Sequence, residues 1–368
     1  MENTMNIDEF AKALKDKLFE INPDMADTHT VNINEVTKNN GTVLHGLTIQ
    51  EEGGNIAPTI YVDQAFDSYK NGESIDVLAN GILNTYEEHK PPQSISVDFF
   101  TDFDQAKERL TMKVINAEKN AEMLDGMPHF AFGDLAAIFQ VQVESNEFGN
   151  AVITVKDEHM DMWGVDVSTL MEYAKANMEE KQPIRIQSMM EVLAEMMGTT
   201  PEEMMNMEQP PMYVMSNESK VNGAAAMVFT DKIDEFAQQH DANIFILPSS
   251  VHEILLLVDN GEMDVANLES MVREVNATQV APEEVLSDNV YFYDKDEKML
   301  YVAETKEPCV LKASEKKDPA KDSVKKAEKK AEAKDAGSIK DKLTEGKDKS
   351  AALPKMEDKK PTKGQELA

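Results

Sequence analysis

The residues best suited to chemistry lie in residues 243–259, a strongly apolar stretch in which Ser249, Ser250, His252 and Glu253 stand close together. A serine beside a histidine is the beginning of a nucleophile–base pair, because the imidazole can take the proton of the hydroxyl. The same hydroxyls and ring nitrogens can also hydrogen-bond a small ligand or a protein partner. These four residues are therefore the first candidates for a catalytic or binding site.

The geometry of an extended strand decides which of these side chains can meet. Residues 251–258 are apolar at alternate and intervening positions, which predicts a central strand covered on both faces. Ser250 and His252 would then share a face at a Cα separation of about 6.5–7 Å, and Glu253 would point away from both. A third group from another segment would have to hold the far ring nitrogen. The interpretation we favour is a tight turn at Pro248 and the two serines that follow it, with His252 packed and hydrogen-bonded.

Two familiar catalytic patterns and one metal pattern fail in this sequence. No glycines flank the serines as in a nucleophile elbow, and Leu256 occupies the position of the second zincin histidine. A second polar cluster contains Asp157, His159 and Asp161, which are weak candidates for metal ligands because their spacing matches no calcium loop or zinc pattern. We expect a solvated turn there, leading to Trp163, the only tryptophan, as an anchoring aromatic and a weak binding candidate.

Methionine is concentrated in residues 189–215, where nine of the 24 methionines lie. Methionines can line an adaptable binding groove, but methionine at helical spacing is more often part of the core. We therefore expect a buried helix whose inward residues are Met189, Met190, Val192, Leu193, Met196 and Met197.

Three pairs of extended segments, each followed by an amphipathic helix, predict the architecture. The pairs are residues 30–36 with 42–50, 135–144 with 151–156, and 243–247 with 251–259. Each following helix opens with an apolar residue, an aspartate and a valine, and Asp76, Asp166 and Asp264 are candidate N-caps. A structural repeat and a chance likeness both explain this recurrence. Either way, the pattern predicts an α+β fold of largely antiparallel hairpins with helices packed on one face.

Further local patterns divide the chain into lobes. We expect helices at residues 7–19 and 222–239, a hairpin from 289–293 and 299–303, and a helix that begins at Pro201 behind the cap Thr200. These elements suggest an N-terminal α+β lobe in residues 1–125 and a C-terminal α+β lobe in residues 126–310. Residues 311–368 would form a disordered tail rich in lysine, alanine and glutamate, with the folded part ending near Val310.

Charge separates the tail from the body. Residues 312–368 contain 17 lysines and 12 acidic residues, which leaves 20 basic and 57 acidic residues in residues 1–311, a balance of −37. Such an acidic body repels nucleic-acid phosphates and anionic lipid headgroups. We therefore expect a protein or a small molecule as the partner, and neither nucleic acid nor a membrane surface in direct contact with the body.

The expected compartment and cofactors are inferred mainly from sequence motifs that are absent. Cys309 is the only cysteine, so an intrachain disulfide or a cysteine zinc cage cannot form. The acidic N-terminus lacks the pattern of a signal peptide, and no apolar run approaches the length of a membrane span, so we expect a cytoplasmic protein. No phosphate-binding glycine loop, dinucleotide fingerprint or Cys-x-x-Cys pair is present, so no cofactor is expected.

Several stretches resemble a bacterial family known only as domain of unknown function 5688. The resemblance covers residues 7–305, and its most specific element is Leu-Pro-Ser-Ser-x-His-Glu at residues 247–253. The other matching stretches are Gly133-Asp134-Leu135, Trp163 with Ala176-Asn177, residues 212–217, Asn222-Gly223-Ala224, residues 271–276 and residues 283–288. Because the family has no established activity, the resemblance implies a recurring body and transfers no function.

The sequence favours a non-catalytic binding or regulatory protein, because no catalytic constellation with the required spacing is present. A hydrolase or transferase that uses Ser250 and His252 is the main alternative. A third interpretation is a DNA mimic, suggested by the acidic body, which would require carboxylates arranged in a phosphate-like stripe.

Overall fold

The computed structural model describes residues 5–55, 57–88, 96–146, 149–200 and 212–315. They belong to the compact unit Met1–Lys316, whereas the second unit, Lys317–Ala368, lies outside the described residues. The predicted tail therefore falls outside them from residue 316 onward, as does the helix predicted to begin at Pro201. The expected end of the fold near Val310 is too early, because Lys312 and Ala313 form a short strand with Ala131 and Phe130.

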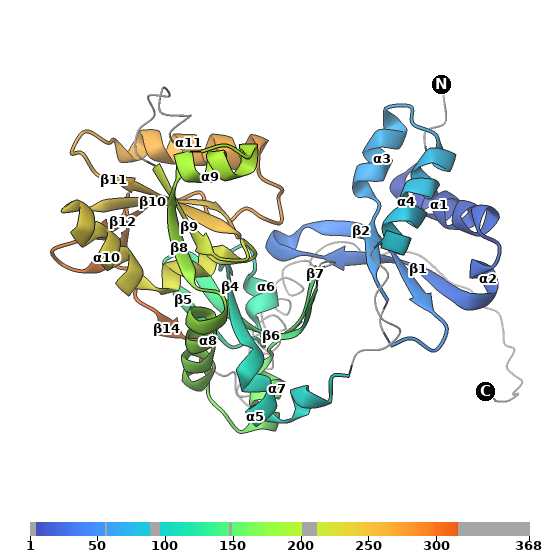
Figure 1. The fold of residues 1–368 in the computed structure, drawn as a ribbon, viewed down its shortest axis with the longest axis horizontal. Coiled ribbons are helices and arrows are strands. Elements are labelled where there is room, and N and C mark those ends of the chain that lie inside the picture. Colours follow the sequence, from blue (N-terminus) through green and yellow to red (C-terminus); the bar gives the residue numbers. More distant parts are fainter. Residues whose placement is uncertain (1–4, 56, 89–95, 147–148, 201–211, 316–368) are drawn as a thin grey trace, which may run out of the picture. The chain divides into compact units, whose positions relative to one another are not determined.

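The first lobe combines a three-stranded antiparallel sheet with helices around a core of its own (Figure 1). The strands are β1 (His29–Thr37), β2 (Val43–Glu51) and β3 (Thr59–Tyr61), with the short 3-10 turn η1 (Asn39–Gly41) between β1 and β2. The helices are α1 (Ile7–Ile21), α2 (Met25–Thr28), α3 (Asp63–Lys70) and α4 (Ile75–Glu88).

Helix α1 forms where the sequence predicts it. Asn6 and Glu9 make a reciprocal capping box at its start, which satisfies two free amide groups of the first turn. Phe10, Leu14 and Leu18 recur at helical spacing and are fully buried against the sheet and α4.

Two further antiparallel sheets form the rest of the described chain. The five-stranded sheet contains β4 (Leu110–Asn116), β5 (His129–Phe132), β6 (Leu135–Asn146), β7 (Gly149–Thr154) and β14 (Lys312–Ala313). The six-stranded sheet has the order β13-β12-β10-β11-β9-β8. Its strands are β8 (Ile184–Ser188), β9 (Met212–Asn217), β10 (Ile244–Ser250), β11 (Glu253–Val258), β12 (Tyr291–Asp294) and β13 (Met299–Val302).

Helices connect and cover these sheets. They are α5 (Phe103–Ala106), α6 (Ala121–Leu124), α7 (Asp157–Trp163), α8 (Val167–Lys181), α9 (Met189–Met197), α10 (Thr230–His240) and α11 (Val265–Thr278), with the 3-10 turns η2 (Asp98–Thr101), η3 (Lys107–Arg109) and η5 (Gly223–Val228). No helix among the described residues is long and apolar enough to cross a membrane.

Strand β11 confirms the expectation of a central strand buried on both faces, because Ile254 and Leu256 belong to the larger core and Leu257 to the core that includes Val272 of α11. The neighbouring strand β10 is buried in the same way. Phe245 and Leu247 pack in the core beneath α11, whereas Ile244 and Ile246 belong to the larger core that includes α10 and η5. Figure 1 shows α11 and α10 on opposite sides of this sheet. The α+β class is thus confirmed, but the six-stranded sheet carries helices on both faces instead of one.

The division expected at residue 125 does not follow the separation of the cores. Strand β4 precedes residue 125 but pairs along its whole length with β6, which follows it. The core of the first lobe contains residues up to Tyr86, and the shared core of the two larger sheets begins at Phe99. As an assignment of domains, the boundary remains a prediction.

The three predicted hairpins exist, but the helices that follow them pack differently. Helix α4 contacts α1, α8 contacts β4, and α11 contacts β10. Asp166 and Asp264 cap their helices as predicted. Asp76 does not, because α4 begins at Ile75 and the Ser74 hydroxyl accepts the hydrogen bond of the Val77 amide. The three hairpin–helix units therefore have the same order of elements but pack their helices differently.

Candidate anion-binding pocket

The turn of the β10–β11 hairpin lies at Val251 and His252, later than the sequence suggests. Strand β10 runs through Pro248 to Ser250, and Ser250 pairs with Glu253 across a register shift. The backbone of Val251 is held outside the hairpin, because its amide donates to Glu284 and its carbonyl accepts from Ala224. His252 therefore sits in a turn, and the predicted face shared by Ser250 and His252 on one strand is wrong.

Both nitrogens of the His252 ring have partners other than Ser250. Its Nδ1 accepts the backbone amide hydrogen of Asn222 at 3.2 Å, and its Nε2 lies 3.4 Å from Glu284 Oε1. The Ser250 hydroxyl accepts the His252 amide hydrogen at 3.0 Å, which is a turn-stabilising role. Within the described chain no hydrogen bond joins this hydroxyl to the imidazole, so the pair is not arranged as nucleophile and base.

The backbone of His252 is part of a tight junction between β9, η5 and the hairpin turn. The Ser216 hydroxyl donates to the His252 carbonyl at 2.8 Å. A Cβ atom at Gly223 would lie 2.0 Å from Ser216 Oγ and 2.4 Å from the His252 carbonyl oxygen, so only glycine fits there. Asn222 enters this junction with a left-handed backbone, φ 54°. Its close packing explains these residue types without any ligand.

The other predicted binding residues face different places. Ser249 lines an apolar groove with Leu255 and Met271, whereas Glu253 lines a separate pocket that contains Arg185 and Lys220. The four candidates of the opening stretch therefore do not converge on one cavity.

The second predicted cluster does not assemble a metal site. His159 Nδ1 accepts the amide hydrogen of Lys156 and so caps α7, and burial lowers the pKa of its ring. Asp157, His159 and Asp161 do not form a group with metal-ligand geometry among the described residues. Trp163 is an anchor, as predicted: its indole donates to the Phe100 carbonyl at 2.8 Å.

The methionine helix is only partly buried, contrary to expectation. Helix α9 forms at Met189–Met197, but Met196 and Met197 are 77% and 69% exposed, and Ala194 is its one buried residue among those described. The helix ends at Gly198, which has a left-handed conformation. Met204, Met205 and Met207 lie outside the described residues.

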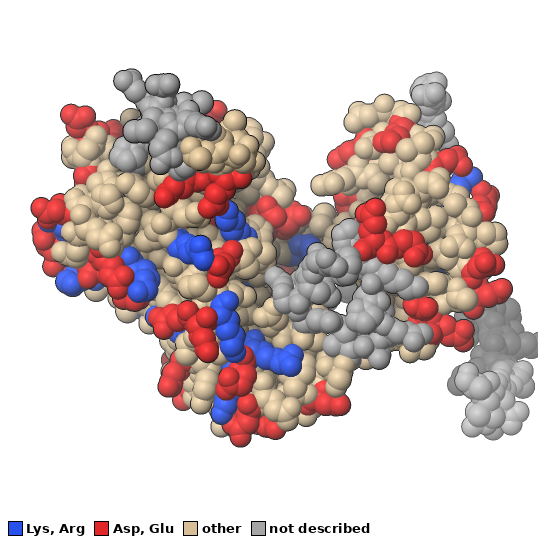
Figure 2. Space-filling view, in the orientation of Figure 1, with Lys and Arg blue, Asp and Glu red and all other residues tan. Residues whose placement is uncertain are grey.

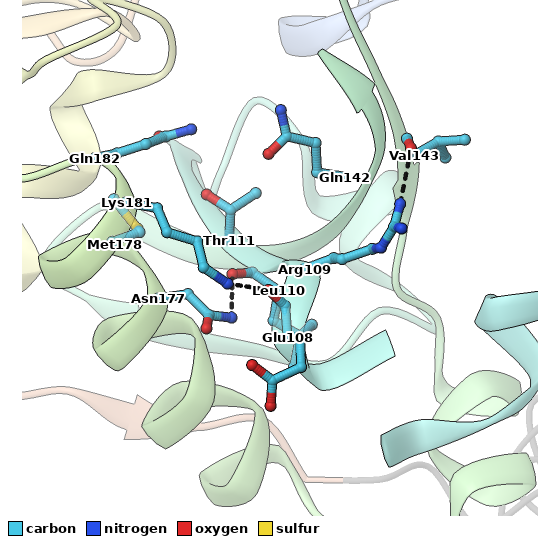
Figure 3. Close-up of a pocket in the computed structure, with 10 residues that line it drawn as sticks. All are labelled: Glu108, Arg109, Leu110, Thr111, Gln142, Val143, Asn177, Met178, Lys181 and Gln182. Carbon is cyan, nitrogen blue, oxygen red and sulfur yellow. Dashed lines mark hydrogen bonds between the residues drawn. The ribbon is translucent and has the colours of Figure 1, made fainter. Parts of the chain in front are cut away.

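A pocket of about 280 Å³ lies where β4 approaches the C-terminal end of α8 (Figure 3). Its walls come from the 3-10 turn before β4, from β4 and β6, and from the last turn of α8. The lining residues are Glu108, Arg109, Leu110, Thr111, Gln142, Val143, Asn177, Met178, Lys181 and Gln182.

Local interactions fix the floor of this pocket. Asn177, which is only 9% exposed, donates hydrogen bonds to the carbonyls of Lys107 and Leu110 at 2.7 and 3.0 Å. These bonds join α8 to the start of β4, while Leu170, Ala174 and Met178 of α8 are buried in the shared core. The spacing between the two walls is therefore set by core packing.

Two cations line the pocket without a carboxylate partner. Arg109 donates to the Val143 carbonyl at 3.0 Å and lies over the Phe99 ring at 4.2 Å, and Lys181 donates to the Glu108 carbonyl. Neither forms an ion pair within the described residues. Figure 3 shows the Glu108 carboxylate directed away from Thr111 and Gln142.

Neighbouring pockets differ in this respect. In the pocket that Glu253 lines, Arg185 pairs with Glu218 and Lys220 pairs with Glu195. A larger pocket beside α10 contains Lys232, which pairs with Glu235 at 3.2 Å. Of these three pockets, the β4–α8 pocket is therefore the one whose cations are free of ion pairs among the described residues and can meet an external anion.

Polar residues continue from this pocket toward His252. Thr111, which lines the pocket, pairs across the strands with Gln140, and Gln140 is 7% exposed. The Asn222 amide contacts Gln140 Oε1 at 3.5 Å, and the backbone of Asn222 holds His252. The turn at His252 is thus connected through Asn222 to Gln140 on β6, the strand that pairs with β4 beside the pocket.

The sequence analysis did not identify this pocket. Its cations are about 70 positions apart and lie in no recognisable motif. The scarcity of arginine was an available signal: the chain contains three arginines, and Arg109 and Arg185 both line pockets. Against 34 lysines, such rare residues mark positions where the planar guanidinium group is needed.

The fold and the pocket together define an α+β protein with a small polar pocket. The family model of the family of unknown function DUF5688 matches residues 7–295, and the chain belongs to that family. This confirms the resemblance seen in the sequence. No curated protein and no solved structure matches the chain.

Proposed function

We propose that this chain is a non-catalytic binding module whose β4–α8 pocket holds a small molecule bearing a carboxylate or phosphate group. The observation that carries the proposal is that Arg109 and Lys181 line one pocket and that neither forms an ion pair with a carboxylate among the described residues. Thr111, Gln142 and Gln182 add neutral hydrogen-bonding groups beside the two charges.

The alternative of a Ser250–His252 hydrolase has less support, because both imidazole nitrogens face other groups. A DNA mimic also has less support. Figure 2 shows the carboxylates scattered over the visible face, with lysines and arginines among them, and no single stripe. We retain the cytoplasm of a bacterium as the proposed location.

The test is isothermal titration of the full chain at low ionic strength with inorganic phosphate and with succinate as probes. We expect saturable binding of at least one anion at one site. Arg109→Gln and Lys181→Gln should each weaken it about tenfold or more, because a charge-assisted hydrogen bond contributes about 1.5–3 kcal/mol.

Matched controls are Arg185→Gln, whose guanidinium is already paired with Glu218, and Lys175→Gln on the same helix as Lys181. These two variants should bind like the wild type. Equal losses in the controls, or no saturable binding of either anion by the wild type, would contradict the proposal.

A further inference from the structure

A histidine and two carboxylates converge in the first lobe, on elements that do not line the β4–α8 pocket. Asp8 lies in the first turn of α1, Glu35 on β1 and His45 on β2. Glu35 and His45 are directly opposite each other in the antiparallel register, so their side chains share a face. One ligand atom from each of the three residues lies within 4.8 Å of the other two.

The orientation of the His45 ring is fixed from behind by a fourth residue. Asp63, the first residue of α3, accepts the His45 backbone amide hydrogen at 2.8 Å with Oδ2 and lies 3.0 Å from ring Nδ1 with Oδ1. An ionised carboxylate can only accept, so Nδ1 carries the proton. In the neutral ring Nε2 is then a free lone pair, and it faces Glu35 Oε1 at 3.8 Å, too far for a hydrogen bond.

A carboxylate on one ring nitrogen with the other nitrogen turned toward further ligands is the arrangement that orients metal-binding histidines. The His45 side chain is 17% exposed, so its position is set by packing, while Glu35 is 70% exposed and can adjust. Asp8 lies in the first turn of α1, where the helix dipole stabilises the negative charge of its carboxylate.

We propose that Asp8, Glu35 and His45 bind one divalent first-row transition-metal ion, with Asp63 as the residue that orients His45. One imidazole and two carboxylates suit zinc, cobalt or manganese better than calcium or magnesium, which take oxygen ligands alone. The ion would join α1 to the β1–β2 hairpin, two elements that otherwise meet through the apolar core of the lobe. The alternative that the test must exclude is contact between His45 and the same carboxylates without a metal ion.

The test uses the full chain without an affinity tag, treated with a chelator and titrated with zinc and with cobalt. We expect one site by calorimetry, visible absorption from bound cobalt that includes a nitrogen ligand, and a higher melting temperature with zinc. Millimolar calcium should not displace the cobalt.

Variants separate the site from chance binding. His45→Gln and Asp8→Asn should lower zinc affinity at least tenfold, and Asp63→Asn should lower it 10–100-fold by changing the ring tautomer. Asp16→Asn makes the same chemical change two turns along α1 at an exposed position and should have no effect.

Circular dichroism of each variant shows whether the variant is still folded. Glu35→Gln provides a further ligand variant at an exposed position. Unchanged zinc affinity in His45→Gln and Glu35→Gln, or no saturable site in the wild type, would overturn the proposal in favour of a metal-free ion pair. This outcome is independent of anion binding in the β4–α8 pocket.

Discussion

Asp134 provides the sharpest test of how the two larger sheets are held together. It lies in the turn between β5 and β6 and accepts hydrogen bonds from three donors on other elements. Oδ1 accepts from the hydroxyl of Tyr291, and Oδ2 accepts from Ser287 at 2.7 Å and from Asn116 at 3.2 Å. Tyr291 and Ser287 are fully buried and Asn116 is 4% exposed, so water cannot readily replace the carboxylate.

Replacement of Asp134 by alanine should cost about 3–5 kcal/mol. A buried donor left without a partner costs roughly 1–3 kcal/mol. Asn116 retains the Leu286 carbonyl as an acceptor and should contribute toward the lower end. Ser287 only accepts from the Asn289 amide, so its hydroxyl and that of Tyr291 each lose the acceptor that Asp134 provides and should contribute more. This sum is a large part of the ~5–15 kcal/mol by which a domain is usually stable.

The assay is urea unfolding followed by tryptophan fluorescence. Trp163 is the only tryptophan and packs against the shared core, so its signal reports on that core and not on the first lobe. With a slope of ~2 kcal/mol per molar urea, the midpoint of Asp134→Ala should fall by about 2 M. Tyr291→Phe should cost less, about 1–2 kcal/mol, because Asp134 keeps two donors.

The double variant decides whether the hydrogen bond is responsible. If Asp134 and Tyr291 act as a pair, their combined cost should be at least ~1 kcal/mol smaller than the sum of the single costs. Strictly additive costs, or a loss below ~1 kcal/mol in Asp134→Ala, would refute the reasoning.

Two further predictions concern buried ionisable groups. Burial, with a contribution from Asp134, raises the pKa of the Cys309 thiol to about 12. The unfolded thiol ionises near pH ~8.5, so the native state binds more protons above that pH, and stability should fall by up to ~1.4 kcal/mol per pH unit between ~8.5 and 12. Urea midpoints at pH 7.5 and 9.5 measure this fall, which Cys309→Ala should reduce; an equal fall in that variant would contradict it. Burial, followed by the charge of Lys38, lowers the pKa of Lys113. Lys113→Met should therefore increase the free energy of unfolding by about 1 kcal/mol, which is seen as a higher urea midpoint. The exposed Lys12→Met should leave the midpoint unchanged. A lower midpoint for Lys113→Met would show that the ammonium group stabilises the fold.

Local patterns were enough to predict most elements of the fold. The apolar spacing of α1, the both-face burial of β10 and β11, and the aspartate caps of α8 and α11 all follow from residues near each other in the chain. Prediction failed where distant residues determine the backbone. The helix expected across residues 222–239 is interrupted at Phe229, because Gly223–Val228 form a 3-10 turn pressed against β9 and the hairpin turn.

The hairpin turn shows the same limit more clearly. Pro248 and the two serines have the composition of a turn, yet they belong to β10. The deciding hydrogen bonds join Val251 to Ala224 and Glu284, which lie about 30 residues away on either side. The residues next to the turn carry no information about these bonds. For this reason the local pattern predicted that His252 lies on a strand and shares a face with Ser250.

The three arginines explain why the pocket rather than the hairpin turn carries the functional proposal. Arg185 pairs with Glu218 and Arg273 pairs with Glu269, as expected in an acidic protein. Arg109 instead contacts a carbonyl and an aromatic ring and forms no ion pair among the described residues. A small anion bound there lies within the ~8 Å screening length of Arg109 and Lys181 and is attracted by them. A polyanion would extend beyond that distance over a body with a balance of −37 and be repelled. The same charge distribution that disfavours nucleic acid therefore permits a small anionic ligand at this one position.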